Sequence, residues 1–263
     1  MSNFRIYGPA PYRVAVIHGG PGAAGEMAPV ARQLATKRSI LEPLQTAGTV
    51  EGQVTELKTV LENSAEFPLT LIGYSWGAWL VFILAAQYPA LVKKLLLVSS
   101  GPFEEKYAAG IMETRLNRLS IQDRTKVTDI LKECEGINTE NKNSLLQQLG
   151  NLLSRADAHD PIETALEPAD KIDYRIDIFQ KVWKTASELR KNGKLLDYSR
   201  QILCPVVALH GDYDPHPFEG VEKPLSKILT DFRFILLKNC GHKPWTERKA
   251  RTIFFNILDE EIS

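Results

Sequence analysis

Short apolar runs alternate with mixed polar segments along the first part of the chain. Four of the runs have the length of buried strands, and they occupy residues 14–17, 39–41, 69–72 and 94–98. A short continuous apolar run is typical of a strand that is buried on both faces, and the segments between these runs are long enough for helices. Residues 13–101 therefore predict β-α repeats around a mostly parallel sheet.

The pattern changes from about residue 103 to about residue 200. Charge and polarity rise, β-branched runs vanish, and apolar residues fall at helical spacings, as do Leu116, Leu119, Ile130, Leu131, Leu145, Leu146, Leu149 and Leu152. This spacing predicts helices. We therefore expect a helical cap insertion at 103–200 within a core made of residues 1–102 and 201–263. An independent helical domain of this size is the alternative.

Runs typical of strands return after the insertion, at residues 205–209 and 232–237. An amphipathic segment from about Pro244 to Leu258 predicts a closing helix. The strands on either side of the insertion need each other to complete one sheet. This need favours one interrupted domain over two separate ones.

Size and composition restrict the class of protein. A chain of 263 residues with 32 basic and 32 acidic side chains can bury a full core, and its charges cancel. No global field draws it to nucleic acid or to an anionic membrane, so we expect a small-molecule partner. Oligomeric state cannot be inferred from this composition.

Three cysteines, Cys134, Cys204 and Cys240, are widely spaced and form no Cys-x-x-Cys pair, which argues against a disulfide scaffold or a zinc site. The histidines show no paired metal-ligand spacing either, so we predict no metal. No apolar run reaches the length that spans a bilayer, and we expect a cytoplasmic protein.

The pentapeptide at residues 73–77, Gly-Tyr-Ser-Trp-Gly, lies between the apolar run 69–72 and a longer apolar segment, 78–86. This context predicts a sharp turn from a strand into a buried helix, with the serine at its apex in an unfavourable backbone conformation. Small residues are required on both sides of such a turn. Ser75 is therefore the candidate nucleophile.

A serine hydroxyl is a weak nucleophile at neutral pH, so it needs an imidazole to take its proton and an acid to orient the imidazole. Candidates follow two later strands. Asp212 and Asp214 come after the run that ends at Leu209, and His242 comes after the run that ends at Leu237. Loops after parallel strands share one edge of the sheet, so we expect these side chains to converge with Ser75. His216 is the alternative base.

A glycine-rich segment, His18 to Gly22, follows the first parallel strand. Attack on a carbonyl creates an oxyanion, which two fixed backbone amides stabilise. We expect these amides to be those of Trp76 and Gly20, because Pro21 has no N–H. A turn that serves only the strand-to-helix geometry is the alternative. The segment lacks the Gly-Lys-Ser/Thr ending of a phosphate-binding loop.

Together these features resemble the α/β-hydrolases: a serine elbow, then a Gly-x-x-Asp acid, then a Gly-His near the end, with a helical insertion before the acid. The resemblance covers nearly the whole chain. It implies Ser75 as nucleophile, His242 as base and Asp214 as the acid, because the family acid usually stands three residues after this glycine. It also implies a structural role for His18, which in this family usually braces the glycine loop. Such enzymes use no cofactor.

The family usually opens with an antiparallel strand pair, but here only a short strand such as residues 4–7 fits before Val14. We therefore expect a sheet of six or seven strands.

The glycine loop and the Gly-x-Ser-Trp-Gly elbow are similar to those of proline iminopeptidases, which remove an N-terminal residue from short peptides. Three features depart from that pattern. Tyr74 stands where those enzymes usually carry glycine, residues 42–48 lack their arginine, and the carboxylates of Glu104, Glu105 and Glu113 do not match the amine-binding positions of their cap.

The sequence therefore predicts a cofactor-independent serine hydrolase that cleaves a small ester, thioester or amide through an acyl-enzyme on Ser75. Two alternatives stay open. The same triad could transfer protons in a lyase or synthase, or the fold could serve as a small-molecule receptor without turnover.

Overall fold

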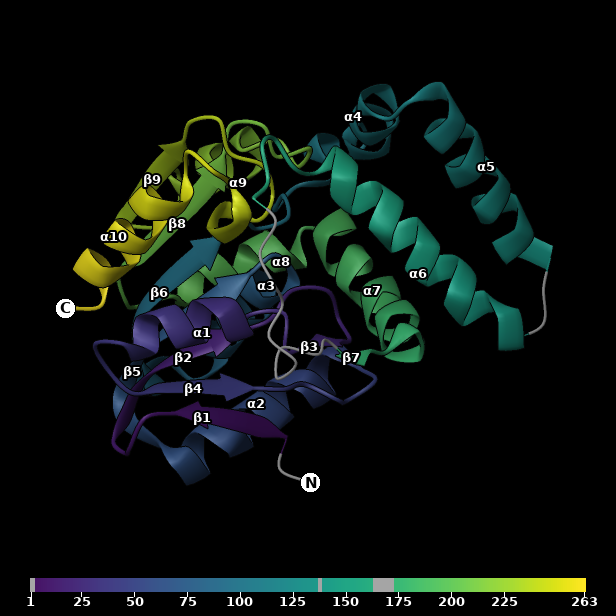
Figure 1. Ribbon diagram of the computed structural model, residues 1–263. Helices are drawn as coiled ribbons and strands as arrows, with labels where there is room; N and C mark the ends of the chain where they lie inside the picture. The colour runs from purple at the N-terminus through teal and green to yellow at the C-terminus, as the bar shows by residue number, and fades with distance from the viewer. Residues whose placement is uncertain (1–2, 137–138, 163–172) are drawn as a thin grey trace.

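A seven-stranded sheet forms the centre of the computed structural model, which describes residues 3–136, 139–162 and 173–263 (Figure 1). Its strands run in the order β1 (Phe4–Tyr7), β4 (Ile40–Pro43), β2 (Tyr12–Ile17), β5 (Ala65–Tyr74), β6 (Val92–Val98), β8 (Val206–Gly211) and β9 (Phe232–Leu237). Only the edge strand β1 is antiparallel to its neighbour in this sheet. The predicted mostly parallel sheet of six or seven strands is confirmed.

Helices cover both faces of the sheet because successive side chains of each strand point to opposite faces. In β2, Ala15 and Ile17 belong to one core cluster and Val14 and Val16 to the other. The first cluster lies under α2 (Val50–Ser64), α3 (Trp76–Gln87), α7 (Ile176–Lys191), α8 (Lys194–Asp197) and α9 (Glu219–Leu225). The second lies under α1 (Ala28–Ala35) and α10 (Arg251–Glu261). Both faces of the strands are therefore apolar, as their continuous apolar runs predict.

Part of the insertion stands apart from the sheet. Helices α4 (Ile111–Arg118), α5 (Ile121–Gly136) and α6 (Thr139–Ala156) lie to one side of it in Figure 1. They share a separate apolar cluster of Leu119, Val127, Ile130, Leu149, Leu152 and Ala156. The helical spacing in the sequence therefore corresponds to real helices with their own small core.

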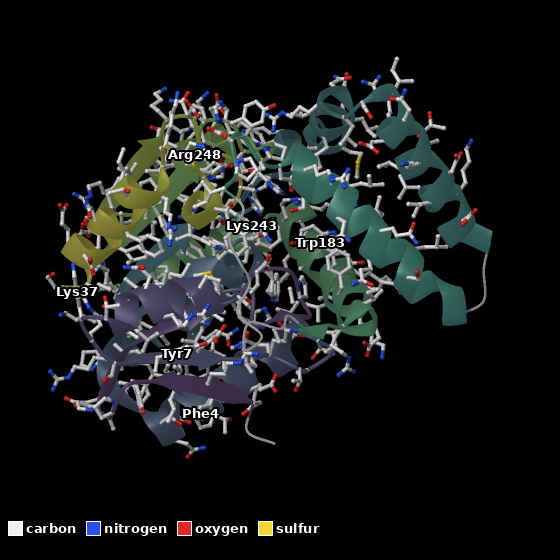
Figure 2. All side chains as sticks on the ribbon, viewed as in Figure 1. Phe4, Tyr7, Lys37, Trp183, Lys243 and Arg248 are labelled. Carbon is white, nitrogen blue, oxygen red and sulfur yellow. The ribbon has the colours of Figure 1, made fainter. Side chains whose placement is uncertain are left out.

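Another part of the insertion packs against the sheet's own helices. Ile178, Val182 and Ala186 of α7 are buried in the main core cluster. Trp183, labelled in Figure 2, stacks on Trp79 of α3 with ring centroids 5.8 Å apart. Helix α7 thus packs on the core helices, whereas α5 and α6 form a separate pair.

The closing helix begins later than its amphipathic pattern predicts. Pro244–Thr246 form a single 3₁₀ turn and α10 begins at Arg251. Backbone groups between them bond to the insertion: Ile162 N–H donates to Thr246 O (2.8 Å) and Arg248 N–H donates to Asp160 O (3.0 Å). Those groups are already satisfied outside the helix, so the helix starts after them.

The sequence pattern also left several short pieces unassigned. Strand β5 begins at Ala65 rather than at Leu69, and two short strands, β3 (Ala23–Ala24) and β7 (Asp173–Tyr174), pair with each other. Within the described ranges, no helix has both the length and the apolar character needed to cross a bilayer. Cys204 and Cys240 are free thiols.

Candidate active site

Ser75 lies at the turn from β5 into α3, with a backbone φ of 51° and ψ of −113°. Every residue from Leu69 to Ala86 is buried except Ser75, which is partly exposed. Its N–H donates to Val98 O on the neighbouring strand β6 (2.9 Å). A non-glycine residue with this φ costs about 1–3 kcal/mol, which the surrounding core must offset. The turn therefore displays one hydroxyl on an otherwise apolar layer.

The two glycines of the elbow are required by close backbone packing. A Cβ on Gly73 would lie 2.3 Å from Gly77 O, and a Cβ on Gly77 would lie 2.5 Å from both Ile17 O and His18 O. Real Cβ atoms do not approach backbone oxygens so closely. Helix α3 can therefore begin directly against the end of β2 only without side chains at these positions.

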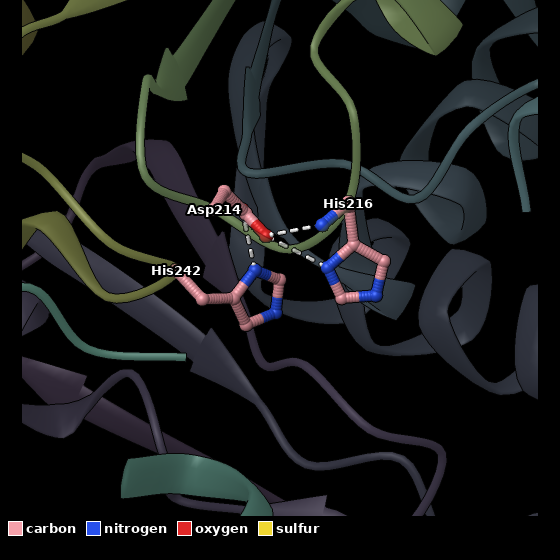
Figure 3. Close-up of side chains that lie close together, drawn as sticks. All are labelled: Asp214, His216 and His242. Atoms are coloured by element: carbon pink, nitrogen blue, oxygen red, sulfur yellow. Dashed lines mark hydrogen bonds and ion pairs between the residues drawn. The ribbon is translucent and has the colours of Figure 1, made fainter. Parts of the chain in front are cut away.

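The structure brings Ser75, His242 and Asp214 together. His242 Nε2 lies 3.1 Å from Ser75 Oγ, and its Nδ1 lies 2.7 Å from Asp214 Oδ2. Figure 3 shows the second of these contacts. Asp214 follows β8 and His242 follows β9, so both loops leave the carboxyl edge of the sheet, as does the elbow. The imidazole thus bridges a hydroxyl and a carboxylate, the geometry of a nucleophile with its base and orienting acid.

Asp212, the competing acid, lies elsewhere. Its carboxylate accepts a hydrogen bond from Cys240 N–H (3.3 Å) and lies 3.7 Å from Lys238 Nζ. Asp214 is the carboxylate that contacts His242. The two acids therefore have separate partners, although only one residue separates them in the chain.

Three imidazoles surround Asp214. His242 and His216 each place Nδ1 against one carboxylate oxygen, at 2.7 and 2.8 Å, and His210 Nε2 lies 3.4 Å from Oδ2. Burial alone would raise the pKa of Asp214, but these three imidazoles and the hydrogen bond from His216 hold it well below its ordinary value. Asp214 is therefore a carboxylate whenever the site works near neutral pH.

His216, the alternative base, contacts the acid instead of the nucleophile. Its backbone N–H and its Nδ1 both donate to Asp214 Oδ1, at 2.9 and 2.8 Å (Figure 3). Burial lowers its pKa to about 4, against the attraction of Asp214. His242, not His216, is the imidazole in contact with Ser75.

His18 and His210 brace loops at the site. His18 Nδ1 donates to Gly19 O (2.7 Å) while its Nε2 accepts from Gln45 N–H (3.2 Å). His210 Nε2 donates to His216 O (2.8 Å), since a carbonyl oxygen can only accept. Burial lowers the pKa of both imidazoles. Each is therefore a neutral hydrogen-bonding group, and His18 has the bracing role expected of it.

Of the two expected oxyanion donors, one directly follows Ser75 in the chain and the other lies in the loop after β2. Trp76 is the first residue of α3, and the first amides of a helix have no acceptor within it. Gly20 follows the end of β2 with a φ of 38°, in the loop that His18 braces. Tyr74 fills the space beneath this loop. Its ring centroid lies 5.0 Å from that of His242, and a Cβ on Gly19 would lie 2.6 Å from the Tyr74 ring.

Asp214, His216 and His242 are the one group of three potential metal ligands in the part of the chain that the structure describes, with ligand atoms within 4.8 Å of one another. In the observed arrangement both Nδ1 atoms donate hydrogen bonds to the carboxylate. A nitrogen that carries a hydrogen cannot bind a metal. The contacts of this cluster are therefore those of a hydrogen-bonded acid with two imidazoles.

Sequence reasoning missed Glu247, whose carboxylate holds the His242 loop. This buried side chain accepts from three backbone amides: Gly241 N–H (3.0 Å), His159 N–H (2.8 Å) and Asp160 N–H (2.8 Å). Lys243, on the same loop, pairs with Glu26 Oε1 at 2.7 Å; Figure 2 labels it and Arg248. A glutamate inside an expected amphipathic helix carries no signal of such a role.

The fold has a counterpart among known protein families. The sequence model of a family described as alpha/beta hydrolase fold matches residues 45–247, which is more than half of the chain. The chain belongs to the α/β-hydrolase fold family, and the resemblance stated from the motifs is confirmed.

The curated relatives are distant hydrolases. A proline iminopeptidase of Lactobacillus delbrueckii subsp. bulgaricus is 26% identical over 278 aligned positions, covering 94% of this chain and 90% of the relative. A pimeloyl-[acyl-carrier protein] methyl ester esterase of Wigglesworthia glossinidia brevipalpis is 24% identical over 184 positions, and that match covers 66% of this chain and 63% of the esterase.

Among solved structures, VinJ superposes with a TM-score of 0.70 at 17% identity, covering 98% of this chain and 93% of VinJ. Identity at this level establishes a shared fold alone.

Proposed function

We propose that this protein is a serine hydrolase that cleaves a small ester, thioester or amide through an acyl-enzyme on Ser75. One observation carries the proposal: His242 lies within hydrogen-bonding distance of both Ser75 Oγ, at 3.1 Å, and Asp214 Oδ2, at 2.7 Å. The hydrolase relatives support the same class of reaction.

Each group has one task in this mechanism. His242 Nε2 takes the proton of Ser75 Oγ as the oxygen attacks the substrate carbonyl carbon. The amides of Gly20 and Trp76 stabilise the resulting oxyanion. His242 then gives the proton to the leaving group, the acyl-enzyme forms, and water attacks it with His242 again as base. Asp214 holds the Nδ1 hydrogen and stabilises the imidazolium.

We propose that residues 103–200 act as a cap over this site and select the substrate. Two carboxylates of these residues are engaged in ion pairs: Glu105 pairs with Arg190 at 2.7 Å and Glu104 with Lys106 at 2.9 Å. These ion pairs leave neither group free for a substrate ammonium. We therefore expect esters and thioesters to react faster than aminoacyl arylamides in a panel of graded acyl length.

Covalent labelling tests the nucleophile. A fluorophosphonate should label the wild-type protein at Ser75, and Ser75→Ala should abolish labelling and lower kcat by a factor on the order of 10⁵. Ser100→Ala is a matched control, because it removes a hydroxyl near the end of β6 that donates to Gly101 O (3.0 Å). That variant should label normally.

A folded wild-type protein that does not react with the fluorophosphonate would contradict the proposal. Turnover of a metabolite without ester hydrolysis would instead favour proton-transfer chemistry on the same residues. Recovery of a tightly bound, unchanged ligand would favour a receptor.

A further inference from the structure

The two oxygens of Asp214 are divided between two imidazoles. Oδ2 accepts from His242 Nδ1, whereas Oδ1 accepts from both the backbone N–H and the Nδ1 of His216. Figure 3 shows the three contacts radiating from one carboxylate. Catalysis by His242 needs only the first, so the role of the ring of His216 requires a separate explanation.

His216 is held rigidly enough to orient its partner. The backbone carbonyl oxygen of His216 accepts a hydrogen bond from His210 Nε2 (2.8 Å). The centroid of its ring lies 4.6 Å from that of the His242 ring, and the two ring planes are inclined by 32°. Its side chain is only 13% exposed. The backbone of His216 is therefore held by the end of β8, and the ring of His242 lies beside its imidazole.

The protonation state of His216 is defined by these surroundings. Burial lowers its pKa to about 4. The titratable groups around it are Asp214, His210, His242 and, from α4, Arg115. A neutral imidazole carries one hydrogen, and the neighbouring carboxylate oxygen keeps that hydrogen on Nδ1. His216 is thus a steady donor to Oδ1 near neutral pH.

A carboxylate without this donor would have another orientation open to it. Asp214 Oδ2 already lies 3.4 Å from His210 Nε2, a donor that competes with His242. Rotation about the Cβ–Cγ bond exchanges the two oxygens and changes the angle presented to His242. Two donors from one residue on Oδ1 oppose that rotation.

Resting on the acyl-transfer function proposed above, we propose that His216 is a positioning residue: its Nδ1 hydrogen bond to Oδ1 of Asp214 aims Oδ2 at Nδ1 of His242. The ring also withdraws negative charge from the carboxylate. Its removal should therefore leave Asp214 a stronger partner for the protonated form of His242.

Three substitutions at this position separate the positioning role from other roles. The amide nitrogen of His216→Asn stands as many bonds from the backbone as Nδ1 does, so this variant keeps the donor to Oδ1. The amide nitrogen of His216→Gln corresponds to Nε2 instead. His216→Leu keeps apolar bulk without any donor. The backbone N–H to Oδ1 remains in all three.

We expect His216→Leu and His216→Gln to lower kcat for an activated ester about 10- to 100-fold with KM changed less than about threefold, the range typical of supporting hydrogen bonds. His216→Asn should stay within about threefold of wild type. The acid limb of the kcat/KM profile should move to higher pH in the Leu and Gln variants and stay in place in the Asn variant. Circular dichroism and thermal unfolding would verify that each variant is folded.

Two results would overturn the inference. A folded His216→Leu variant with wild-type kcat and pH profile would leave the ring no positioning role. Rescue by Gln and not by Asn would show that Nε2 acts on the substrate directly.

Failure of the proposed function is distinguishable. If the wild-type protein neither labels nor hydrolyses esters, NMR titration of the His242 ring still tests the positioning role, because the His216→Leu variant should protonate His242 at higher pH than wild type does. An unchanged His242 titration would reject it.

Discussion

Buried imidazoles govern the chemistry of this site at the scale of single residues. Burial lowers the pKa of His18, His210 and His216, so each is neutral and has one donor and one acceptor nitrogen. Their hydrogen-bond partners then fix which nitrogen carries the hydrogen. These neutral imidazoles thus hold the loops around Ser75 through directional hydrogen bonds.

A neutral buried histidine also makes stability depend on pH. The pKa of His216 is about 4 in the folded protein, against an ordinary value of 6.5. Between these values the unfolded chain binds more protons than the folded one, so acidification favours unfolding. The contribution of neutral His216 to the free energy of unfolding is fully present above pH 6.5 and is lost as pH falls toward 4.

We expect His216→Asn to lose this contribution. Between pH 6.5 and pH 4 the free energy of unfolding of wild type should fall by about 3 kcal/mol more than that of the variant, at about 1.4 kcal/mol per pKa unit. Urea unfolding at a series of pH values measures the difference. Asp214, His210 and His18 remain in both proteins, so parallel pH curves would contradict the assignment.

At the scale of elements, the approach of α3 to β2 sets the position of Ser75. The helix is buried along its length from Trp76 to Ala86, and it starts where the β2 strand ends. The turn between β5 and α3 is tight because a glycine stands on each side of Ser75. A side chain at either glycine would have to displace backbone atoms, because the atoms nearest to its Cβ belong to the backbone.

Gly77→Ala tests this packing. The added Cβ would lie 2.5 Å from one backbone oxygen at the end of β2 and 2.5 Å from another in the loop after it. We therefore expect the free energy of unfolding to fall by about 2–3 kcal/mol. We also expect kcat to fall tenfold or more, because Ser75 shifts. Gly150→Ala in α6 is the matched control. Nothing lies within 4 Å of that Cβ, so the substitution should stabilise the helix by up to about 1 kcal/mol. Equal effects of the two substitutions in chemical denaturation would refute the packing account.

At the scale of the whole molecule, Glu247 joins the insertion to the loop of His242. Its carboxylate bonds the amides of His159 and Asp160 from the insertion and that of Gly241 from the loop. Asp157 O accepts from the N–H of His242 itself (2.8 Å). The position of His242 therefore depends on contacts with the insertion as well as on Asp214.

Removing this carboxylate should affect both stability and rate. Glu247→Ala leaves three backbone amides without their hydrogen-bond acceptor. Each unsatisfied amide costs about 1–3 kcal/mol where water does not replace the carboxylate, so we expect the free energy of unfolding to fall by at least about 3 kcal/mol. The kcat should fall more than KM rises, because His242 loses support. Glu62→Ala is the control: its exposed pair with Lys58 should contribute less than about 0.5 kcal/mol. Chemical denaturation and steady-state kinetics measure both effects, and a Glu247→Ala protein as stable as the control would exclude the coupling.

The sequence by itself determined the sheet, the elbow and the order of the chemistry-bearing loops. These features have local signals: apolar runs such as Phe232–Leu237 match a strand residue for residue, and the glycines beside Ser75 mark a turn that other residues cannot make. Local patterns are readable because burial and backbone strain act on neighbouring residues. The motif resemblance added a preference for Asp214 and His242 over their rivals.

Tertiary structure alone decided the partners. Asp214 contacts three imidazoles, whereas Asp212 contacts Cys240. Glu247 bonds the insertion, and the closing helix starts at Arg251. Each of these outcomes depends on segments that are far apart in the chain. Hydrogen bonds form or fail within a few tenths of an ångström. Hydrophobic periodicity fixes which face of an element is buried, but it does not fix distances of that size between loops.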